Sequence, residues 1–257
     1  TQATKPPHIR INCTSDFPQI IVTCGRRMAG VSIALKARAK KQGAQLTTIH
    51  LQDPRLSPQY FDILIVPHHD PARGKNVIVT KAALNRLNQP LIDAASKKLP
   101  KPWRSASSPR VAVLIGGENR RYTISDKMAN DMADQLARFA KSNNANLFLI
   151  QSRRCPETVW HILQSALKHT NLYVNEKQQP NPYPGVLGIA DIVIVTSDSI
   201  NMVSEAAYTG KPVMIAYWTS ETGRIKKFHQ TMKNEGHCAP LTKKLPAHKF
   251  VPLIQND

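Results

Sequence analysis

Short apolar runs alternate with helix-like stretches along most of this chain, and no other feature limits its fold as strongly. Such an alternation is typical of βαβ units, in which helices join parallel strands. We therefore expect an α/β fold of two Rossmann-like, doubly wound parallel-sheet domains that face a cleft. The expected strands are residues 20–24, 46–50, 63–67, 77–79, 111–115, 146–150, 172–174, 191–195 and 213–217. The expected helices are 29–43, 125–142, 156–168 and one that ends at Thr209.

A segment of different composition, "KKLPKPWRSASSP" at residues 97–109, interrupts this pattern. It contains three Pro and three Ser and has no apolar periodicity, which is typical of a linker. The sequence therefore predicts an N-terminal domain of residues 1–96, the linker 97–109 and a C-terminal domain of residues 110–257.

The composition excludes several classes of protein. A chain of 257 residues with 41% apolar residues can bury a core without disulfides. Its four Cys form no C-x-x-C pair and have no His at metal-site spacing, so neither a disulfide framework nor a metal is expected. The chain has no run of about 18 apolar residues, and its start, "TQATKPPHIR", lacks the apolar segment of a signal peptide. We expect a soluble or membrane-peripheral protein in a reducing compartment.

The net charge of +18 indicates an anionic partner. The charge is uneven, since residues 1–109 hold 17 Lys and Arg against 5 Asp and Glu. Such a surface suits nucleic acid, an anionic membrane or a phosphorylated substrate, and a solvated basic surface would also explain it. Nucleic acid is the least favoured partner, because only 6% of the residues are aromatic and no known binding module is present.

The first of three unusual turns at strand ends is "GGENRR", residues 116–121. Gly116 and Gly117 allow the backbone to approach a ligand closely, and Arg120 and Arg121 add positive charge. A sharp turn alone would also explain the glycines, so phosphate binding and simple turn formation both stay open.

The second turn is "SRRCP", residues 152–156. Ser152, Arg153 and Arg154 lie before a helix that Pro156 opens. Two Arg at a helix N-terminus have the wrong sign for the helix dipole, which is easier to explain if they share an anion. Solvated surface Arg would account equally well for this turn taken alone.

The third turn and the helix after it carry a Ser-Asp-Ser sequence and one Glu. Ser197, Asp198 and Ser199 can cap the helix, whose first amides form an anion site. Glu205 can accept both hydroxyls of a ribose, although a mid-helix Glu is more often solvated. Because ligands bind at the carboxyl ends of parallel strands, the three turns together predict a nucleotide-diphosphate site. Its expected residues are Gly116, Gly117, Asn119, Arg120, Ser152, Arg153, Arg154, Ser197, Asp198, Ser199, Met202 and Glu205.

Two strand ends of the first domain carry further candidates. His69 and Asp70 follow the expected strand 63–67, and a His beside a carboxylate can act as a general base near neutral pH. Asp before Pro is also a common turn start, and this explanation is favoured for the pair taken alone. Gly25, Arg26 and Arg27 form a second anion loop that could contact a phosphate of an acceptor.

Five stretches resemble the elongated-mitochondria (ELM) fission family, whose bacterial members are described as glycosyltransferase-like. The stretches are "FDILIVPHHD", "NVIVTKAALN", "VLIGGENRRYTIS", "SRRCPE" and "NPYPGVLGIADIVIVTSDSINMVSEAAYTGKPV", and the similarity extends from about residue 18 to 235. The resemblance implies a GT-B architecture. It also implies that Gly116 and Gly117 hold the phosphates and that Glu205 holds the ribose, as in the lipid-linked GlcNAc transferase of peptidoglycan synthesis. Family members usually begin with another β-α unit and end in a helical tail, so the first domain is expected to be incomplete.

The resulting hypothesis is a metal-independent GT-B glycosyltransferase with no tightly bound cofactor. A nucleotide-diphosphate sugar would be the donor, and a membrane glycolipid or lipopolysaccharide-type molecule the acceptor. Arg120, Arg153, Arg154 and the amides near Ser199 would stabilise the leaving diphosphate. The expected location is the cytoplasm, peripheral on the inner face of a bacterial membrane. The alternative, implied by the resemblance, is a non-catalytic membrane-surface adaptor that recruits a dynamin-like protein.

Overall fold

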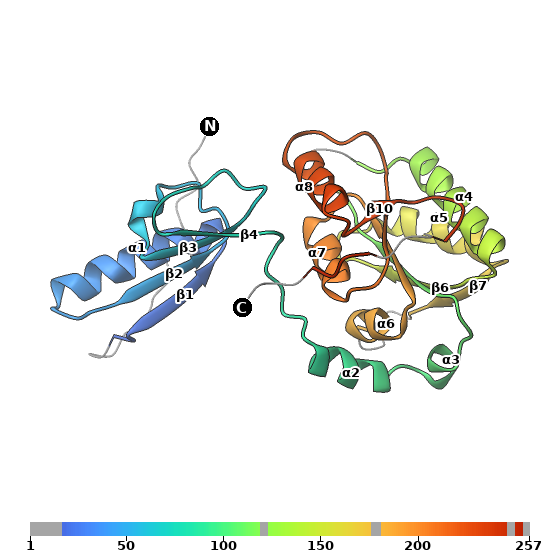
Figure 1. The fold of residues 1–257 in the computed structure, drawn as a ribbon, viewed down its shortest axis with the longest axis horizontal. Coiled ribbons are helices and arrows are strands. Elements are labelled where there is room, and N and C mark those ends of the chain that lie inside the picture. Colours follow the sequence, from blue (N-terminus) through green and yellow to red (C-terminus); the bar gives the residue numbers. More distant parts are fainter. Residues whose placement is uncertain (1–16, 119–122, 176–180, 246–249, 254–257) are drawn as a thin grey trace. The chain divides into compact units, whose positions relative to one another are not determined.

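The computed structural model describes residues 17–118, 123–175, 181–245 and 250–253. The chain divides into two compact units, residues 1–83 and 84–257 (Figure 1). Every strand pair in both units is parallel, and helices join most of the strands. The predicted α/β class is therefore confirmed.

The first unit is a four-stranded sheet in the order β1-β2-β3-β4. All four expected strands are present within a residue or so of their expected bounds. Helix α1 (Arg26–Lys41) joins the first two strands, and a 3-10 helix, η1 (Pro58–Tyr60), precedes the third. The helix begins earlier than expected because Gly25, with φ 79°, turns the chain directly out of the first strand. The strands are β1 (Ile20–Cys24), β2 (Thr47–Leu51), β3 (Ile63–Pro67) and β4 (Val77–Thr80).

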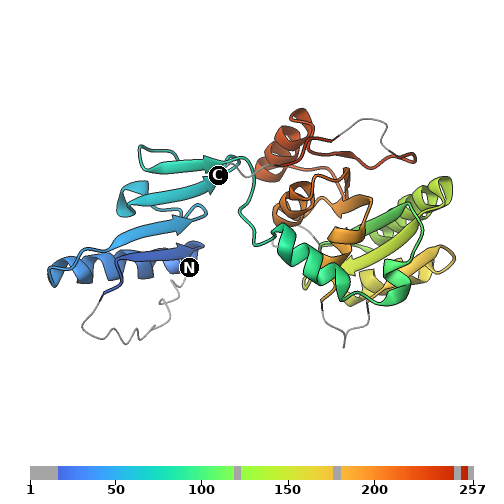
Figure 2. The same cartoon turned by 60° about the horizontal axis from the view of Figure 1, so that its bottom comes forward.

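Helix α1 lies along this sheet (Figure 2) and buries Ala29, Ser32 and Ala39. Apolar side chains of the two edge strands remain exposed, since Val22 of β1 and Ile78 of β4 are 62% and 53% accessible to solvent. Parallel sheets are usually covered on both faces, so these edge strands are unusually open among the described residues.

A buried polar pair lies inside the first unit. The hydroxyl of Thr23 is 2.8 Å from Nδ1 of His50, and the His50 ring stacks on Phe61 with centroids 4.7 Å apart. Burial lowers the pKa of His50, because the charged imidazolium loses its hydration in this position. His50 is therefore a neutral core residue.

The second unit is a six-stranded sheet in the order β10-β9-β8-β5-β6-β7. Its expected strands are all confirmed, and a short sixth strand follows them. Its strands are β5 (Arg110–Ile115), β6 (Asn146–Gln151), β7 (Asn171–Val174), β8 (Ile192–Thr196), β9 (Val213–Ala216) and β10 (Ala239–Pro240). Its helices are α2 (Gln89–Lys97), α3 (Lys101–Arg104), α4 (Asp126–Asn143), α5 (Glu157–Leu167), α6 (Tyr183–Ile189), α7 (Ile200–Tyr208) and α8 (Gly223–Asn234).

The main core of the second unit lies between the sheet and helices α4 and α5. Val113 of β5 packs there with Leu136 of α4 and Leu163 of α5, and all three side chains are fully buried. The 3.6-residue period of α4 and α5 is what made these helices predictable. Helices α2, α3, α6 and α8 were not expected, because they are short or carry Pro, Gly or many charges.

The division between the units falls earlier than the sequence indicated. It lies after Ala83, whereas the sequence placed a linker at residues 97–109. Within that range Trp103 is buried, with its ring 5.5 Å from Phe148 and 6.2 Å from Tyr173. The large apolar area of this Trp holds the Pro-rich segment on the second sheet.

Helix α2 also belongs to the second unit, because it packs on α6 at very close range. A Cβ atom on Gly188 of α6 would lie 2.0 Å from the hydroxyl of Ser96, and one on Gly185 would lie 2.7 Å from the carbonyl of Ala95. Only Gly at these two positions allows the helices to approach this closely.

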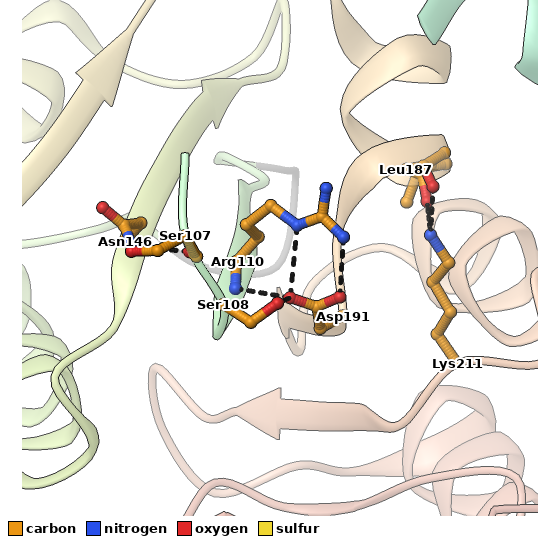
Figure 3. Close-up of polar contacts among 8 residues, drawn as sticks. Ser107, Ser108, Arg110, Asn146, Leu187, Asp191 and Lys211 are labelled. Atoms are coloured by element: carbon orange, nitrogen blue, oxygen red, sulfur yellow. Dashed lines mark hydrogen bonds and ion pairs between the residues drawn. The ribbon is translucent and has the colours of Figure 1, made fainter. Parts of the chain in front are cut away.

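A polar cluster lies at the amino ends of β5 and β8 (Figure 3). Asp191 accepts hydrogen bonds from the Ser108 hydroxyl and the Arg110 amide, both at 2.8 Å, and forms an ion pair with Arg110 at 2.9 Å. Lys211 donates to the carbonyls of Leu187 and Gly188, which end helix α6. Burial lowers the pKa of Lys211 to about 8. These contacts fix α6 to the sheet at the edge opposite the three turns.

Candidate functional site

The three turns that the sequence singled out are brought together at one edge of the second sheet. Strand β5 pairs with β6 on one side and with β8 on the other. Because all three strands run parallel, their carboxyl ends open at the same edge. The described turns are 116–118, 152–156 and 197–199, while Asn119, Arg120 and Arg121 lie outside the described residues.

The carboxylate of Asp198 lies at the centre of these turns. It accepts hydrogen bonds from the Gly117 amide at 2.9 Å, the Thr196 hydroxyl at 2.7 Å and the Trp218 indole at 3.2 Å. Arg154 forms an ion pair with it at 3.6 Å, and the side chain of Asp198 is fully buried. Asp198 thus connects residues that follow or end β5, β6, β8 and β9, and its oxygens are engaged by the protein itself.

Gly116 and Gly117 are explained by this packing. A Cβ atom on Gly116 would lie 1.9 Å from an oxygen of Asp198, and one on Gly117 would lie 2.0 Å from the carbonyl oxygen of Arg154. The Gly116 amide donates to the Thr196 hydroxyl at 2.7 Å, so both glycine amides are used internally. The space on the Cβ side of each glycine is therefore filled by protein.

Other groups at this edge carry positive charge. The side chain of Arg154 is about half exposed despite its ion pair, and Arg153 next to it is exposed. The Ser152 hydroxyl accepts a hydrogen bond from the Arg154 amide at 3.3 Å, which shapes the turn. These two guanidinium groups supply positive charge beside the carboxyl end of β6.

The N-terminus of α7 lies at the carboxyl end of the adjacent strand β8. Ser199 caps it, because its hydroxyl accepts a hydrogen bond from the amide of Met202, and the first turn contains no acidic residue. The amides of Ile200 and Asn201 precede the first intrahelical bond, which runs from Val203 to Ser199. Amides in this position attract anions. Ser197 is buried, and its amide donates to Ala216, so it supports the turn.

Glu205 lies in the middle of α7 and is held by Tyr183 of α6. The Tyr183 hydroxyl donates to Oε2 of Glu205 at 2.6 Å. Burial raises the pKa of Glu205, and the bond from Tyr183 partly opposes that effect. Burial and the nearby carboxylate raise the pKa of Tyr183, so this phenol stays protonated and acts as the donor. Glu205 is thus a half-buried, oriented acceptor.

Sequence reasoning missed three residues that organise this site. They are Tyr183, Thr196 and Trp218, which bond to Glu205 and Asp198. Trp218 could have been identified from the sequence, because a Trp next to an apolar strand is expected to be buried and its indole N–H then requires an acceptor. Tyr183 could not have been identified in this way, because only the packing of α6 brings it to α7.

The candidates of the first unit gather at the carboxyl edge of the first sheet. Gly25 caps α1, and its amide donates to the carbonyl of Leu51 at 3.1 Å, while Arg26 and Arg27 open the helix. His69 and Asp70 follow β3, and the Asp70 amide donates to Pro67 at 2.9 Å. Both sets lie where strand ends of a parallel sheet meet ligands.

No three His, Cys, Asp or Glu side chains in the described ranges lie together as they would around a metal ion. None of the described helices has the length and apolar character required to cross a membrane.

Solved structures of low sequence identity share this fold. One is a UDP-GlcNAc 2-epimerase from Neisseria meningitidis bound to UDP-GlcNAc, with a TM-score of 0.51, 16% identity and coverage of 88% of this chain and 65% of that one. Another is the MnaA protein of S. aureus in a structure with UDP, with a TM-score of 0.52, 15% identity and coverage of 88% and 64%. The chain spans slightly less than two thirds of each of these proteins, and the likeness supports the two Rossmann-like units.

Sequence relatives identify the family. The chain is 28% identical to protein RP120 of Rickettsia prowazekii over 252 residues, with 82% of this chain and 70% of that protein covered. It is 24% identical to mitochondrial fission protein ELM1 of Arabidopsis thaliana over 247 residues, and it spans only 56% of that protein's length. The family model described as mitochondrial fission ELM1 matches residues 2–257. The chain therefore belongs to the mitochondrial fission ELM1 family.

Proposed function

We propose that the second unit binds a nucleotide-diphosphate sugar and that the protein transfers the sugar to an acceptor hydroxyl by a metal-independent, GT-B-type reaction. The observation that carries this proposal is the pairing of Tyr183 with Glu205 of α7, the helix whose N-terminus lies with Arg154 at the carboxyl edge of the sheet. A carboxylate for a ribose and cationic groups for a diphosphate are the two requirements of such a donor site.

Within this proposal the ribose hydroxyls donate to the carboxylate of Glu205, which Tyr183 orients. The diphosphate lies against Arg153, Arg154 and the first amides of α7. Gly116 and Gly117 act indirectly, because their amides are bonded to Thr196 and Asp198 and so shape the turn. The bound UDP-GlcNAc and UDP of the two structural relatives support a uridine nucleotide as the first ligand to test.

The chemistry requires a base and a stabilised leaving group. A base removes the proton of the acceptor hydroxyl, the oxygen attacks the anomeric carbon, and the bond from that carbon to the diphosphate breaks. Arg153, Arg154 and the helix amides would balance the charge that develops on the diphosphate, without a metal or another cofactor. His69, beside Asp70 in the first unit, is the proposed base.

The acceptor is proposed to be a membrane-associated glycolipid or lipopolysaccharide-type molecule. The first 109 residues hold most of the excess positive charge, and each Lys or Arg near an anionic membrane adds about 1 kcal/mol of attraction. Gly25, Arg26 and Arg27 would contact a phosphate of that acceptor. The protein would then work in the cytoplasm, on the inner face of a bacterial membrane.

A second candidate function is a non-catalytic adaptor on a membrane surface that recruits a dynamin-like protein. The observation that favours it is the family itself, since the Arabidopsis relative is a mitochondrial fission protein. An adaptor has no need for a nucleotide, and this difference separates the two candidates.

The test is a thermal-shift screen of the full chain against UDP, GDP, ADP, CMP and their sugars. A ligand that binds only the native state at a hundredfold excess over its Kd stabilises it by about 2.7 kcal/mol. We expect a selective shift that is lost in Glu205→Ala and kept in Asp134→Ala, which removes an exposed helical carboxylate of the same unit. A folded wild-type chain that no nucleotide stabilises would refute the transferase proposal and favour the adaptor.

A further inference from the structure

A pocket of about 500 Å³ lies in the second unit between α8 and the residues that follow β9. Tyr217, directly after β9, and Glu221 in the following loop form one wall, and residues of α8 form the other. Its volume is within the range of small-molecule sites. None of its residues belongs to the proposed nucleotide site, and we call it the α8 pocket.

One side of α8 supplies the polar lining of the α8 pocket. Lys226, His229, Gln230 and Lys233 all line it, and their spacing of three, four and seven residues places them on one side of the helix. Phe228 and Met232 of the same helix are buried in the unit. The core thus fixes the helix and directs two amines, an amide and an imidazole to one space.

The two amines lack partners that would neutralise them. Neither Lys226 nor Lys233 forms an ion pair within the described part of the chain, and both are exposed. The hydroxyls of Thr219 and Ser220 add further hydrogen-bond donors on the loop side. Paired ammonium groups with neighbouring hydroxyl donors suit an anion with several oxygens, such as a phosphate.

A buried Glu-His pair lies among the lining residues of the α8 pocket. Nδ1 of His229 is 2.6 Å from Oε1 of Glu221, and the two side chains are only 3% and 11% exposed. The other ring nitrogen, Nε2, is buried and has no hydrogen-bond partner among the described residues. The bond to Glu221 holds the imidazole in place, and His229 is one of the residues that line the α8 pocket. Since Glu221 is already bonded to His229, it repels an anion less than a free carboxylate would.

We propose that the α8 pocket binds a phosphate ester of a polyol, with the phosphate between Lys226 and Lys233 and a hydroxyl of the polyol toward His229. This chemical group has two sources, a soluble metabolite and the headgroup of a lipid. The proposal does not depend on the nucleotide site, because the two sites share no residue.

The test is isothermal titration of the full chain with glycerol 3-phosphate, together with sedimentation of the chain with phosphatidylglycerol or phosphatidylcholine vesicles. The pocket variant is Lys226→Ala/Lys233→Ala. The control is Lys243→Ala/Lys244→Ala, which removes the same charge from exposed positions outside the pocket. We expect binding of one probe at least to weaken about tenfold in the pocket variant and to stay within about twofold in the control.

The outcomes separate the sources and the sites. If the pocket variant, and not the control, loses binding of glycerol 3-phosphate, the ligand is a soluble ester. If it loses binding of phosphatidylglycerol vesicles alone, the ligand is a lipid headgroup. The proposal is overturned if wild type binds neither probe saturably, or if both double variants lose binding equally, since that result reports only net charge. It is also overturned if Glu205→Ala removes binding of glycerol 3-phosphate while the pocket variant keeps it. A change in the imidazole nitrogen resonances of His229 on titration, absent in the pocket variant, provides a readout independent of affinity.

Discussion

The hydroxyl of Tyr183 donates to Glu205 at 2.6 Å, so the carboxylate proposed for the ribose is oriented by a neighbouring helix. A half-buried carboxylate is costly to keep charged. Its raised pKa means that Glu205 is less easily ionised in the native state than in the unfolded chain. Glu205 therefore lowers the stability of the second unit under the conditions in which it would bind a ligand.

Replacing Glu205 by Gln is expected to stabilise the protein at pH 7. Burial raises the native pKa of Glu205 above its ordinary value of 4.5, so the native state binds more protons and the free energy of unfolding falls as pH rises through that range. Gln cannot ionise, and its amide oxygen can still accept from Tyr183. Calorimetric Tm values of the two chains should differ at pH 7 and converge below pH 4.5. An equal difference at both pH values would contradict this account.

Gly116→Ala is expected to destabilise the second unit by about 3 kcal/mol or more, because its Cβ would collide with the carboxylate of Asp198. Asp198→Ala removes that obstacle but leaves the donors of Gly117 and Trp218 without their acceptor, at a comparable cost. In the double variant the two costs should be less than additive. Urea unfolding of the four chains measures this coupling.

Two control substitutions make that cycle specific. Gly117→Ala meets the backbone carbonyl of Arg154, which Asp198→Ala does not remove, so the steric part of its cost should remain in the Asp198→Ala background, although the bond from the Gly117 amide to Asp198 is lost there. Gly30 lies in α1, and a Cβ atom there would meet nothing within 4 Å beyond its chain neighbours and the backbone of its own helix. Gly30→Ala should therefore stabilise the first unit by about 1 kcal/mol. Rescue of Gly117→Ala by Asp198→Ala would show that the proposed steric cause is incorrect.

The first unit is expected to lose stability in mild acid through His50. Burial lowers the pKa of His50 below 6.5, so below pH 6.5 the unfolded chain binds a proton that the native state excludes. The free energy of unfolding should fall as pH decreases from 6.5 toward the native pKa. His50→Gln should remove this part of the pH dependence, as measured by hydrogen exchange of amides in β2 and β3. An identical acid response in the variant would exclude His50 as its source.

Lys211 predicts an effect at alkaline pH. Its pKa is lowered to about 8 from 10.5, so between these values the unfolded chain binds more protons than the native state and stability rises with pH. Lys211→Met removes this rise, and it also removes the donor to the carbonyls of Leu187 and Gly188. The stability lost in the variant should therefore be larger at pH 10 than at pH 8 in urea unfolding. A constant difference would show that Lys211 does not titrate in this range.

The structure confirms most of the elements that local sequence patterns specify. Strands such as β5 and β8 are continuous apolar runs, which buried parallel strands require, and α4 has the apolar period of a helix on a core. Helix α6 was not predictable in the same way, because "YPGVLGI" has two Gly and a Pro and is held in place by α2. The linker interpretation of residues 97–109 differed from the structure because the burial of Trp103 outweighs the local effect of three Pro.

The sequence by itself determined the fold class and the sheet edge at which the three polar turns meet, because both follow from local periodicity and the direction of parallel strands. Tertiary structure decided what each polar residue at that edge does. From the sequence, Asp198 was a candidate for binding a ligand. In the structure its oxygens accept hydrogen bonds from Gly117, Thr196 and Trp218 and pair with Arg154. Glu205 gained an oriented carboxylate only because α6 places Tyr183 beside it. Such roles depend on contacts between residues far apart in the chain, and local patterns carry no information about those contacts.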